Sequence, residues 1–394
     1  MAAPGVEFGT KTPISRKGIE PTQVKSIKLI SDLDDGAAND STRTIKEKSG
    51  IVFGKTYTFK VDSYTNGDPK DVNLVKWAVS YTDRETGKLY ENVLKDVSTG
   101  DEINITFNDA NGCGNNLEIK AYINDVDNEG KLTLFKHNRF RFFDRKTLKT
   151  EIQQRINTGK DIDQGQSSMC AIALIGHFMA IQNPTEYEKV ILDLHRKGEA
   201  IITSTQYKIK LDSDDHLIEM KDSDVKYPKN SYGGKMSYAD YIYLFSIKDF
   251  LNGIFDYDPD GPGAGGFVEG GTGLTFPNEV EKMMKNILGY KDVKNETNLI
   301  TSKWANAKDS ANELSQLLAD GYSIGLLITA ENFQHNNKAT FSIPNHWVGL
   351  KTITIDEQGG KIILTLFTWG DINKVWTVLY DPFEDGYFGF VAGK

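Results

Sequence analysis

The chain has 394 residues and a formal net charge of −9, from 46 basic and 55 acidic residues. Acidic residues are spread along it without a basic patch, which argues against nucleic acid as a partner. Its two cysteines, Cys113 and Cys170, lie in unrelated settings, so a disulfide-framed secreted scaffold is excluded. No stretch approaches the roughly 18–20 apolar residues that a bilayer crossing needs, so no membrane span is predicted.

Residues 1–24 are polar and rich in Gly, Pro and Thr, which predicts a flexible N-terminal segment. They contain no apolar core of a secretory signal peptide. We therefore expect synthesis in the cytoplasm and, if the protein leaves the cell, export without a Sec signal peptide.

Residues 25–145 form a succession of short alternating runs rich in β-branched and aromatic residues, separated by Gly- and Asn-rich turns. The expected strands are 24–30, 55–64, 73–83, 88–94, 102–107, 116–125 and 132–143. Seven strands without a helical pattern favour an all-β, immunoglobulin-like sandwich. We interpret this domain as a binding or docking module.

Residues 146–394 differ in pattern, because helices come first and strands follow. Helices are expected at 149–157, 171–182, 184–195, 237–252, 277–288 and 307–319, and strands at 322–330, 346–356, 361–370 and 374–381. Helices and strands that segregate along the chain are typical of an α+β domain. The helix at 171–182 is apolar enough to be buried nearly all round.

Cys170 stands at the start of that apolar helix, after a polar, glycine-containing loop. A thiol attacks as its thiolate, and the positive end of a helix dipole favours the anion. The base that activates a cysteine is usually distant in sequence and close only in the fold. Cys170 is therefore a candidate nucleophile, and its base is to be sought elsewhere in the chain.

Three segments carry a resemblance to a known superfamily. Residues 163–170 read DQGQSSMC, residues 344–348 read PNHWV, and residues 368–370 read TWG. In this order they resemble the Gln-Gly…Cys, Asn-His-x-Val and Ser-Trp-Gly segments of the papain-like cysteine hydrolases. The similarity extends over about residues 147–394.

The resemblance implies an α+β papain-like hydrolase domain that needs no cofactor and acts on a protein or peptide. Cys170 would be the nucleophile and His346 its base. Gln164, six residues before the cysteine, would donate to the oxyanion. The family's own pattern is not complete, since Ser167 stands where it has its first cysteine.

The third catalytic residue is the open position. Where the family has the Asn that orients its histidine, a direct match gives Phe367, which cannot hold an imidazole. Asp371, just beyond the TWG segment, is our first choice. Asp381, at the end of the next expected strand, is the second, and Thr368 is the third.

Three aspartates form a weaker motif. Asp256, Asp258 and Asp260 copy the first half of an EF-hand calcium loop, but Phe267 occupies the position of the bidentate glutamate. We favour an acidic loop on the substrate side, with calcium binding as the alternative. No other metal site is expected.

The combination of a sandwich with a papain-like domain looks like a secreted bacterial toxin effector of a type VI-like secretion system. Its sandwich would dock on the secretion apparatus, its hydrolase would cleave a protein in the target cell, and a cognate immunity protein would inhibit it. Two alternatives remain open. The same site could act as a peptidoglycan amidase or glutamine deamidase, or the chain could be a non-catalytic binding protein with a degenerate papain-like domain.

Overall fold

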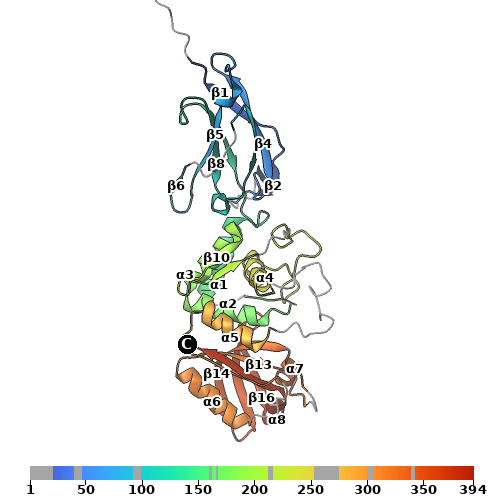
Figure 1. The fold of residues 1–394 in the computed structure, drawn as a ribbon. Helices are drawn as coiled ribbons and strands as arrows, with labels where there is room; N and C mark the ends of the chain where they lie inside the picture. Colours follow the sequence, from blue (N-terminus) through green and yellow to red (C-terminus); the bar gives the residue numbers. More distant parts are fainter. Residues whose placement is uncertain are drawn as a thin grey trace, which may run out of the picture. The chain divides into compact units, whose positions relative to one another are not determined.

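The structure, a computed structural model, describes residues 21–39, 47–91, 99–158, 162–165, 167–211, 216–252, 275–299, 306–338 and 342–394. It contains helices together with antiparallel sheets, as expected of an α+β fold. The described residues fall into two compact units (Figure 1). The first comprises those within Met1–Asp32, Lys55–Phe107 and Asn115–Leu134, and the second those within Leu33–Gly54, Asn108–Gly114 and Phe135–Lys394.

The first unit consists of antiparallel strands in two sheets, of order β1-β4-β7 and β6-β5-β8-β9. The strands are β1 (Val24–Leu29), β4 (Thr56–Tyr64), β5 (Lys76–Thr82), β6 (Leu89–Tyr90), β7 (Glu102–Thr106), β8 (Asn116–Tyr122) and β9 (Gly130–Phe135), with a short 3₁₀ helix η1 (Val72–Leu74). Alternate side chains are buried, such as Tyr57, Phe59 and Val61 of β4. This is the period of two that the sequence pattern predicts for a strand with one buried face.

The prediction of a strand over residues 132–143 is wrong in its second half, because β9 ends at Phe135. Beyond it the aromatic residues pack against helices of the second unit instead of joining a sheet. Phe140 and Phe143 both contact the ring of Tyr241. Burial against a helical core therefore outweighs the strand propensity of this segment.

A hairpin within the range 25–145 belongs to the second unit. Its strands are β2 (Asp34–Ala37) and β3 (Glu47–Gly50), and the segment that holds the 3₁₀ helix η2 (Ala110–Gly112) joins the same unit. The Ala37 amide donates to the Arg141 carbonyl at 2.7 Å, and the Ile51 amide donates to the Phe135 carbonyl at 2.8 Å. These backbone hydrogen bonds tie the hairpin to the chain that leads into the helices.

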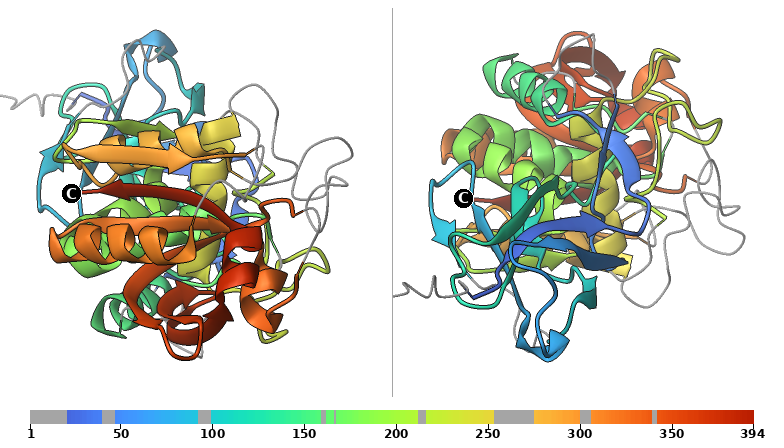
Figure 2. Two further views of the ribbon diagram at one scale, coloured as in Figure 1. Left: turned by 90° about the horizontal axis from the view of Figure 1, so that it is seen from below. Right: turned by 90° about the horizontal axis from the view of Figure 1, so that it is seen from above.

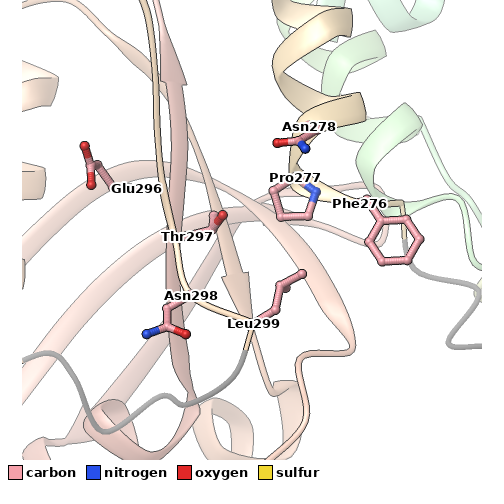
Figure 3. A pocket seen from close by; sticks show the side chains of 7 residues that line it. All are labelled: Phe276, Pro277, Asn278, Glu296, Thr297, Asn298 and Leu299. Carbon is pink, nitrogen blue, oxygen red and sulfur yellow. The ribbon is translucent and has the colours of Figure 1, made fainter.

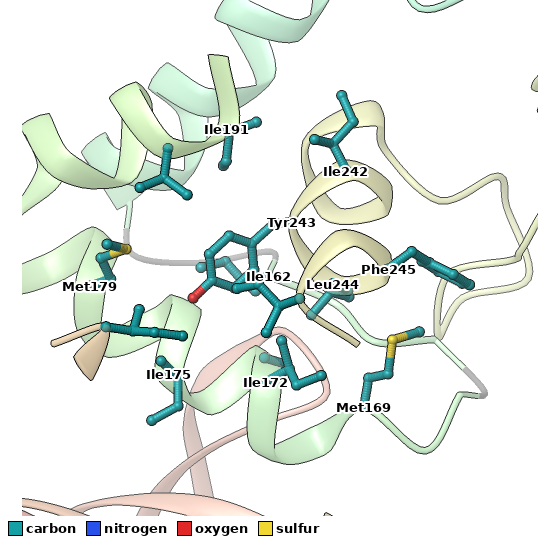
Figure 4. Packing of buried hydrophobic residues seen from close by; sticks show 14 of the residues in the cluster. Ile162, Met169, Ile172, Ile175, Met179, Ile191, Ile242, Tyr243, Leu244 and Phe245 are labelled. Carbon is teal, nitrogen blue, oxygen red and sulfur yellow. The ribbon is translucent and has the colours of Figure 1, made fainter. Parts of the chain in front are cut away.

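The helical part of the second unit is organised around a buried helix. Its elements are α1 (Arg145–Thr158), α2 (Cys170–Gln182), α3 (Pro184–Lys197), β10 (Glu199–Ile201), β11 (Lys208–Lys210) and α4 (Tyr238–Asn252). Every residue of α2 from Cys170 to Ala180 is buried, which confirms the expectation for this apolar segment. Ile172 and Ile175 of α2 belong to one buried core with Tyr243 of α4, whose ring points toward α2 in Figure 4.

A six-stranded antiparallel sheet completes the second unit, in the order β12-β17-β13-β14-β15-β16. Its strands are β12 (Val293–Thr297), β13 (Ser323–Ile328), β14 (His346–Asp356), β15 (Lys361–Thr368), β16 (Asp371–Leu379) and β17 (Tyr387–Gly393), and the remaining helices are α5 (Pro277–Asn286), α6 (Ala307–Ala319), α7 (Ala330–His335) and α8 (Tyr380–Gly386). Helices α2 and α6 cover opposite faces of it (Figures 1 and 2). Trp347 packs in the core with α2, and its neighbour Val348 in the core with α6.

Within the described residues, no helix combines the length and apolar character needed to cross a bilayer.

Candidate active site

Cys170 is the first residue of α2, and only 4% of the residue is exposed. The backbone amides of Cys170 and Ala171 lie close enough to the sulfur to favour its anion. This follows from the geometry of a helix start, where the first amides have no partner within the helix. The structure thus gives Cys170 the position that the sequence predicted for it.

His346 is the first residue of β14, and the backbone that follows it contacts the Cys170 sulfur. The amide of the following residue, Trp347, donates to the Cys170 sulfur at 3.4 Å. Because backbone bond lengths are fixed, this contact keeps the His346 Cα within about 6 Å of the sulfur. Two residues that are 176 positions apart in the chain are therefore brought together at the start of an inner strand of the sheet.

The imidazole of His346 is buried, with 4% of the residue exposed, and it has a defined partner. Its Nε2 atom lies 2.7 Å from the Thr368 hydroxyl oxygen. The ring stacks on Trp369, with 4.3 Å between ring centroids and 12° between the planes. Because Nε2 is occupied by Thr368, Nδ1 is the nitrogen that remains to exchange a proton with the thiol.

Trp369 is held over the histidine by a tight turn between β15 and β16. Trp369 has a φ of 46° and Gly370 a φ of 76°, so both central residues are left-handed. This pattern is typical of a two-residue hairpin turn, but it is strained for a bulky side chain such as Trp. Strained backbone of this kind clusters at functional sites, and here it places an aromatic ring over the candidate base.

The two aspartates ranked first and second are not found against His346. Asp371 is exposed on β16 and accepts a hydrogen bond from the Asn373 amide at 2.9 Å. Asp381 is ion-paired with Lys338, and both side chains are 65% exposed. The expected strand at 374–381 ends at Leu379, so Asp381 lies in the first turn of α8 instead of at a strand end. Thr368, the third choice, is the one that contacts the ring.

Phe367, the residue before Thr368, packs in the hydrophobic core. Its ring stacks on His177 of α2, with centroids 3.9 Å apart and planes at 4°. It belongs to the core that surrounds α2. Phe367 is therefore used for packing and offers His346 no polar partner.

Gln164 lies in the loop before α2 and is 6% exposed. Its side-chain amide donates to the Ser167 carbonyl at 3.1 Å, which leaves the second N–H of the amide to serve an oxyanion. Gly165 follows with a φ of 59°, and a Cβ on it would meet the Lys229 carbonyl at 2.0 Å. Only glycine lets the loop take this shape against residues 229–231.

Burial governs the ionisation of the pair. It raises the pKa of Cys170 to about 11, although the Trp347, Ala171 and Cys170 amides act in the opposite direction. Burial also lowers the pKa of His346 to about 3. The resting site therefore holds a neutral thiol and a neutral imidazole, so His346 would act as a general base during attack.

Lys248 on α4 is a group that the sequence did not single out. Its charge acts to lower the pKa of Cys170, and burial lowers the pKa of its own ammonium group. It is thus a cation within electrostatic range of the sulfur. A helical lysine carries no motif, so only the packing of α4 against α2 could reveal it.

The reaction of Cys170 with iodoacetamide is expected to follow the raised pKa. A group whose thiolate is disfavoured in the fold has less reactive anion at each pH below the folded pKa. The alkylation rate should therefore be lower than that of the urea-unfolded protein between pH 6 and 9 and should still rise above pH 9. Peptide mapping after timed alkylation measures it. A rate that is already constant below pH 7 would show a preformed ion pair and contradict this.

The candidate calcium residues Asp256, Asp258 and Asp260 lie outside the described residues. Among the residues that the structure does describe, no group of three or more His, Cys, Asp or Glu could hold a metal ion.

An open pocket of about 610 Å³ lies between the start of α5 and the end of β12. Phe276 and Leu299 are exposed at it, and Figure 3 shows both side chains. The residue before Phe276 lies close to the candidate site in space, since the carbonyl of Thr275 accepts a hydrogen bond from the Trp347 indole at 3.0 Å.

Searches against protein-family models and against curated proteins found no match to this chain. The resemblance to papain-like hydrolases is therefore carried by the motif residues alone and stays a prediction.

Proposed function

We propose that the chain is a Cys–His amide hydrolase with a papain-like domain that follows an immunoglobulin-like sandwich. The observation that carries this proposal is the meeting of two distant motifs. Cys170 opens a buried helix, and the backbone beside His346 contacts its sulfur. A nucleophile, a base and a partner for the base are the minimum set for acyl transfer through a thioester.

Each residue has a role in the proposed reaction. As the Cys170 sulfur attacks the carbonyl carbon, its proton passes to Nδ1 of His346. The Cys170 amide and the Gln164 side chain stabilise the oxyanion, at about 3–4 kcal/mol for each donor. His346 then protonates the leaving amine, and water hydrolyses the thioester. Thr368 keeps the imidazole in place through Nε2.

We further propose that the substrate is a protein and that the chain is a type VI-like toxin effector acting in a target cell. Its first unit would dock on the secretion apparatus, and a cognate immunity protein would block the site. The alternating strands of the first unit and the Cys–His motifs of the second support this placement.

A peptidoglycan amide or a protein glutamine is the alternative substrate for the same residues. The chemistry is shared, because each reaction forms and hydrolyses a thioester. Incubation of the purified protein with casein, with bacterial sacculi and with a glutamine-rich protein separates the three. New peptide termini in casein are expected. Release of muropeptides or of ammonia alone would replace peptide-bond hydrolysis by one of the alternatives.

A second candidate function is non-catalytic binding by a degenerate papain-like domain. The observation that favours it is the burial of the pair, since Cys170 and His346 are each 4% exposed and neutral at rest. Absence of any Cys170-dependent hydrolysis in the three incubations would select this function.

A further inference from the structure

A cavity of about 450 Å³ in the second unit is lined in part by sequence neighbours of two candidate site residues. It is lined on one side by Asp163, which precedes Gln164, and on another by Gly370, which follows Trp369. The other walls come from α1 and from the segment that leads into α4. The cavity wall therefore includes the chain neighbours of the candidate oxyanion donor, Gln164, and of the ring that covers His346, Trp369.

Two ion pairs line the cavity, and within each the positive and negative charges balance. Arg155 makes a bidentate pair with Asp240, with nitrogen–oxygen distances of 2.7 and 3.1 Å, and both side chains are buried. Lys235 pairs with Asp222 at 3.5 Å near the surface. Neither cation is left over to receive an acidic ligand.

Two carboxyl groups of the wall remain without a cation of their own. Asp163 accepts hydrogen bonds from the amides of Gly165 and Ser231, both at 2.8 Å, and from the Ser231 hydroxyl. Glu151 accepts from the Ala239 amide at 3.0 Å, and burial raises its pKa to about 7. No ion pair to either is formed within the described part of the chain. A cationic group in the cavity would offset the charge of Asp163 and would favour the ionised form of Glu151, which burial disfavours.

Tyr232 supplies an aromatic surface at the edge of the cavity and is 81% exposed. The turn that carries it is held by Asn230, whose side-chain oxygen accepts from the Tyr232 amide at 3.0 Å and from the Gly234 amide at 2.9 Å. The same turn rests on the Gln164 loop through the close contact of Gly165 with Lys229. The backbone at Tyr232 is thus held in place, and its exposed ring is available to stack on a cationic side chain.

We propose that this cavity is the subsite for the leaving-group side of the substrate and takes a lysine or arginine side chain. The inference rests on the proposed function. The leaving amine has to lie beside His346, which protonates it, and the cavity adjoins Gly370 next to the ring that covers His346. Glu151 and Asp163 would meet the positive charge, and Tyr232 the side chain that carries it.

Peptide binding to the full chain with Cys170→Ala tests the subsite without turnover. The probes are fluorescein-labelled pentapeptides in which arginine, lysine or norleucine stands between alanines, with binding read by fluorescence anisotropy. The arginine and lysine peptides should bind about tenfold more tightly than the norleucine peptide. Glu151→Gln, which keeps an oxygen for the Ala239 amide, and Tyr232→Ala should each reduce this preference. Glu313→Gln, an exposed acid on α6, is the charge-matched control and should leave it unchanged.

Equal binding of the three peptides would overturn the subsite, as would a preference that Glu151→Gln and Tyr232→Ala leave intact. Casein hydrolysis by the native chain separates this outcome from failure of the proposed function. Hydrolysis without charge-selective binding rejects the subsite and keeps the hydrolase. Charge-selective binding without hydrolysis keeps the cationic subsite and rejects the hydrolase.

Discussion

Replacement of Cys170 by alanine should lower kcat/KM for a cleaved protein by at least about 10⁴-fold, because the nucleophile of a covalent mechanism cannot be replaced by its neighbours. His346→Ala should cost a similar factor, and the double variant little more, since the two residues act as one unit. Initial rates of casein cleavage measure all three.

The matched control for this experiment is Cys113→Ala, since Cys113 is the other buried cysteine of the chain. Its activity should stay close to that of the native chain. Urea unfolding of each variant separates loss of chemistry from loss of fold. Native-like cleavage by a folded Cys170→Ala variant would refute the role of the cysteine.

Thr368→Val should lower kcat/KM by about 10- to 100-fold, because it removes the hydroxyl on His346 Nε2 and keeps the shape of the side chain. The factor corresponds to the loss of one buried hydrogen bond, which costs about 1–3 kcal/mol. Thr368→Ser should restore most of the activity, since it returns the hydroxyl. Initial rates at saturating and at low substrate concentration measure the effect.

Variants of Asp371 and Asp381 serve as the comparison for the Thr368 variants. Asp371→Asn and Asp381→Asn should each change kcat/KM by less than about twofold, because exposed polar substitutions away from the reacting atoms have small effects. A loss at Asp371 that exceeds the loss at Thr368 would mean that the carboxylate reaches His346 in the working enzyme, and the assignment of Thr368 would then be wrong.

Much of the fold follows from periodicity. The apolar run of α2 and the alternating β4 both have strong patterns, and both form where they are expected. The β2–β3 hairpin and α8 have none. Residues 34–37 read DDGA, whose pairing depends on the chain near Arg141, and α8 begins within a segment that continues a strand pattern. Tertiary contacts determine the secondary structure of such segments, and these contacts cannot be read from the local sequence.

The site shows the same division. Cys170, Gln164 and His346 carry local motifs, and the sequence alone could name them. The partner of His346 depends on strand register. The pairing of β15 with β16 is irregular between Leu366 and Thr368. Since a shift of one residue turns each side chain to the other face, a direct match to the family's Asn position points to Phe367 while Thr368 contacts the ring.

The charge state of Cys170 also could not be predicted from the sequence. A helix start favours a thiolate by about 0.3–1 kcal/mol at an exposed position. Burial of the Cys170 sulfur acts in the opposite direction and is the larger effect, since it raises the pKa to about 11. Which of the two prevails depends on how much chain covers the sulfur, and only the packing of α2 against β14 fixes that.

Covalent labelling by a peptidyl vinyl sulfone tests the central claim most directly. This electrophile reacts with a thiol that a neighbouring base activates, and the chain contains two cysteines that can be compared within one sample. Intact mass and peptide mapping should show one label, on Cys170 and not on Cys113, that is lost in His346→Ala. Labelling of Cys170 that is unchanged in His346→Ala, or equal labelling of both cysteines, would contradict a Cys–His catalytic pair.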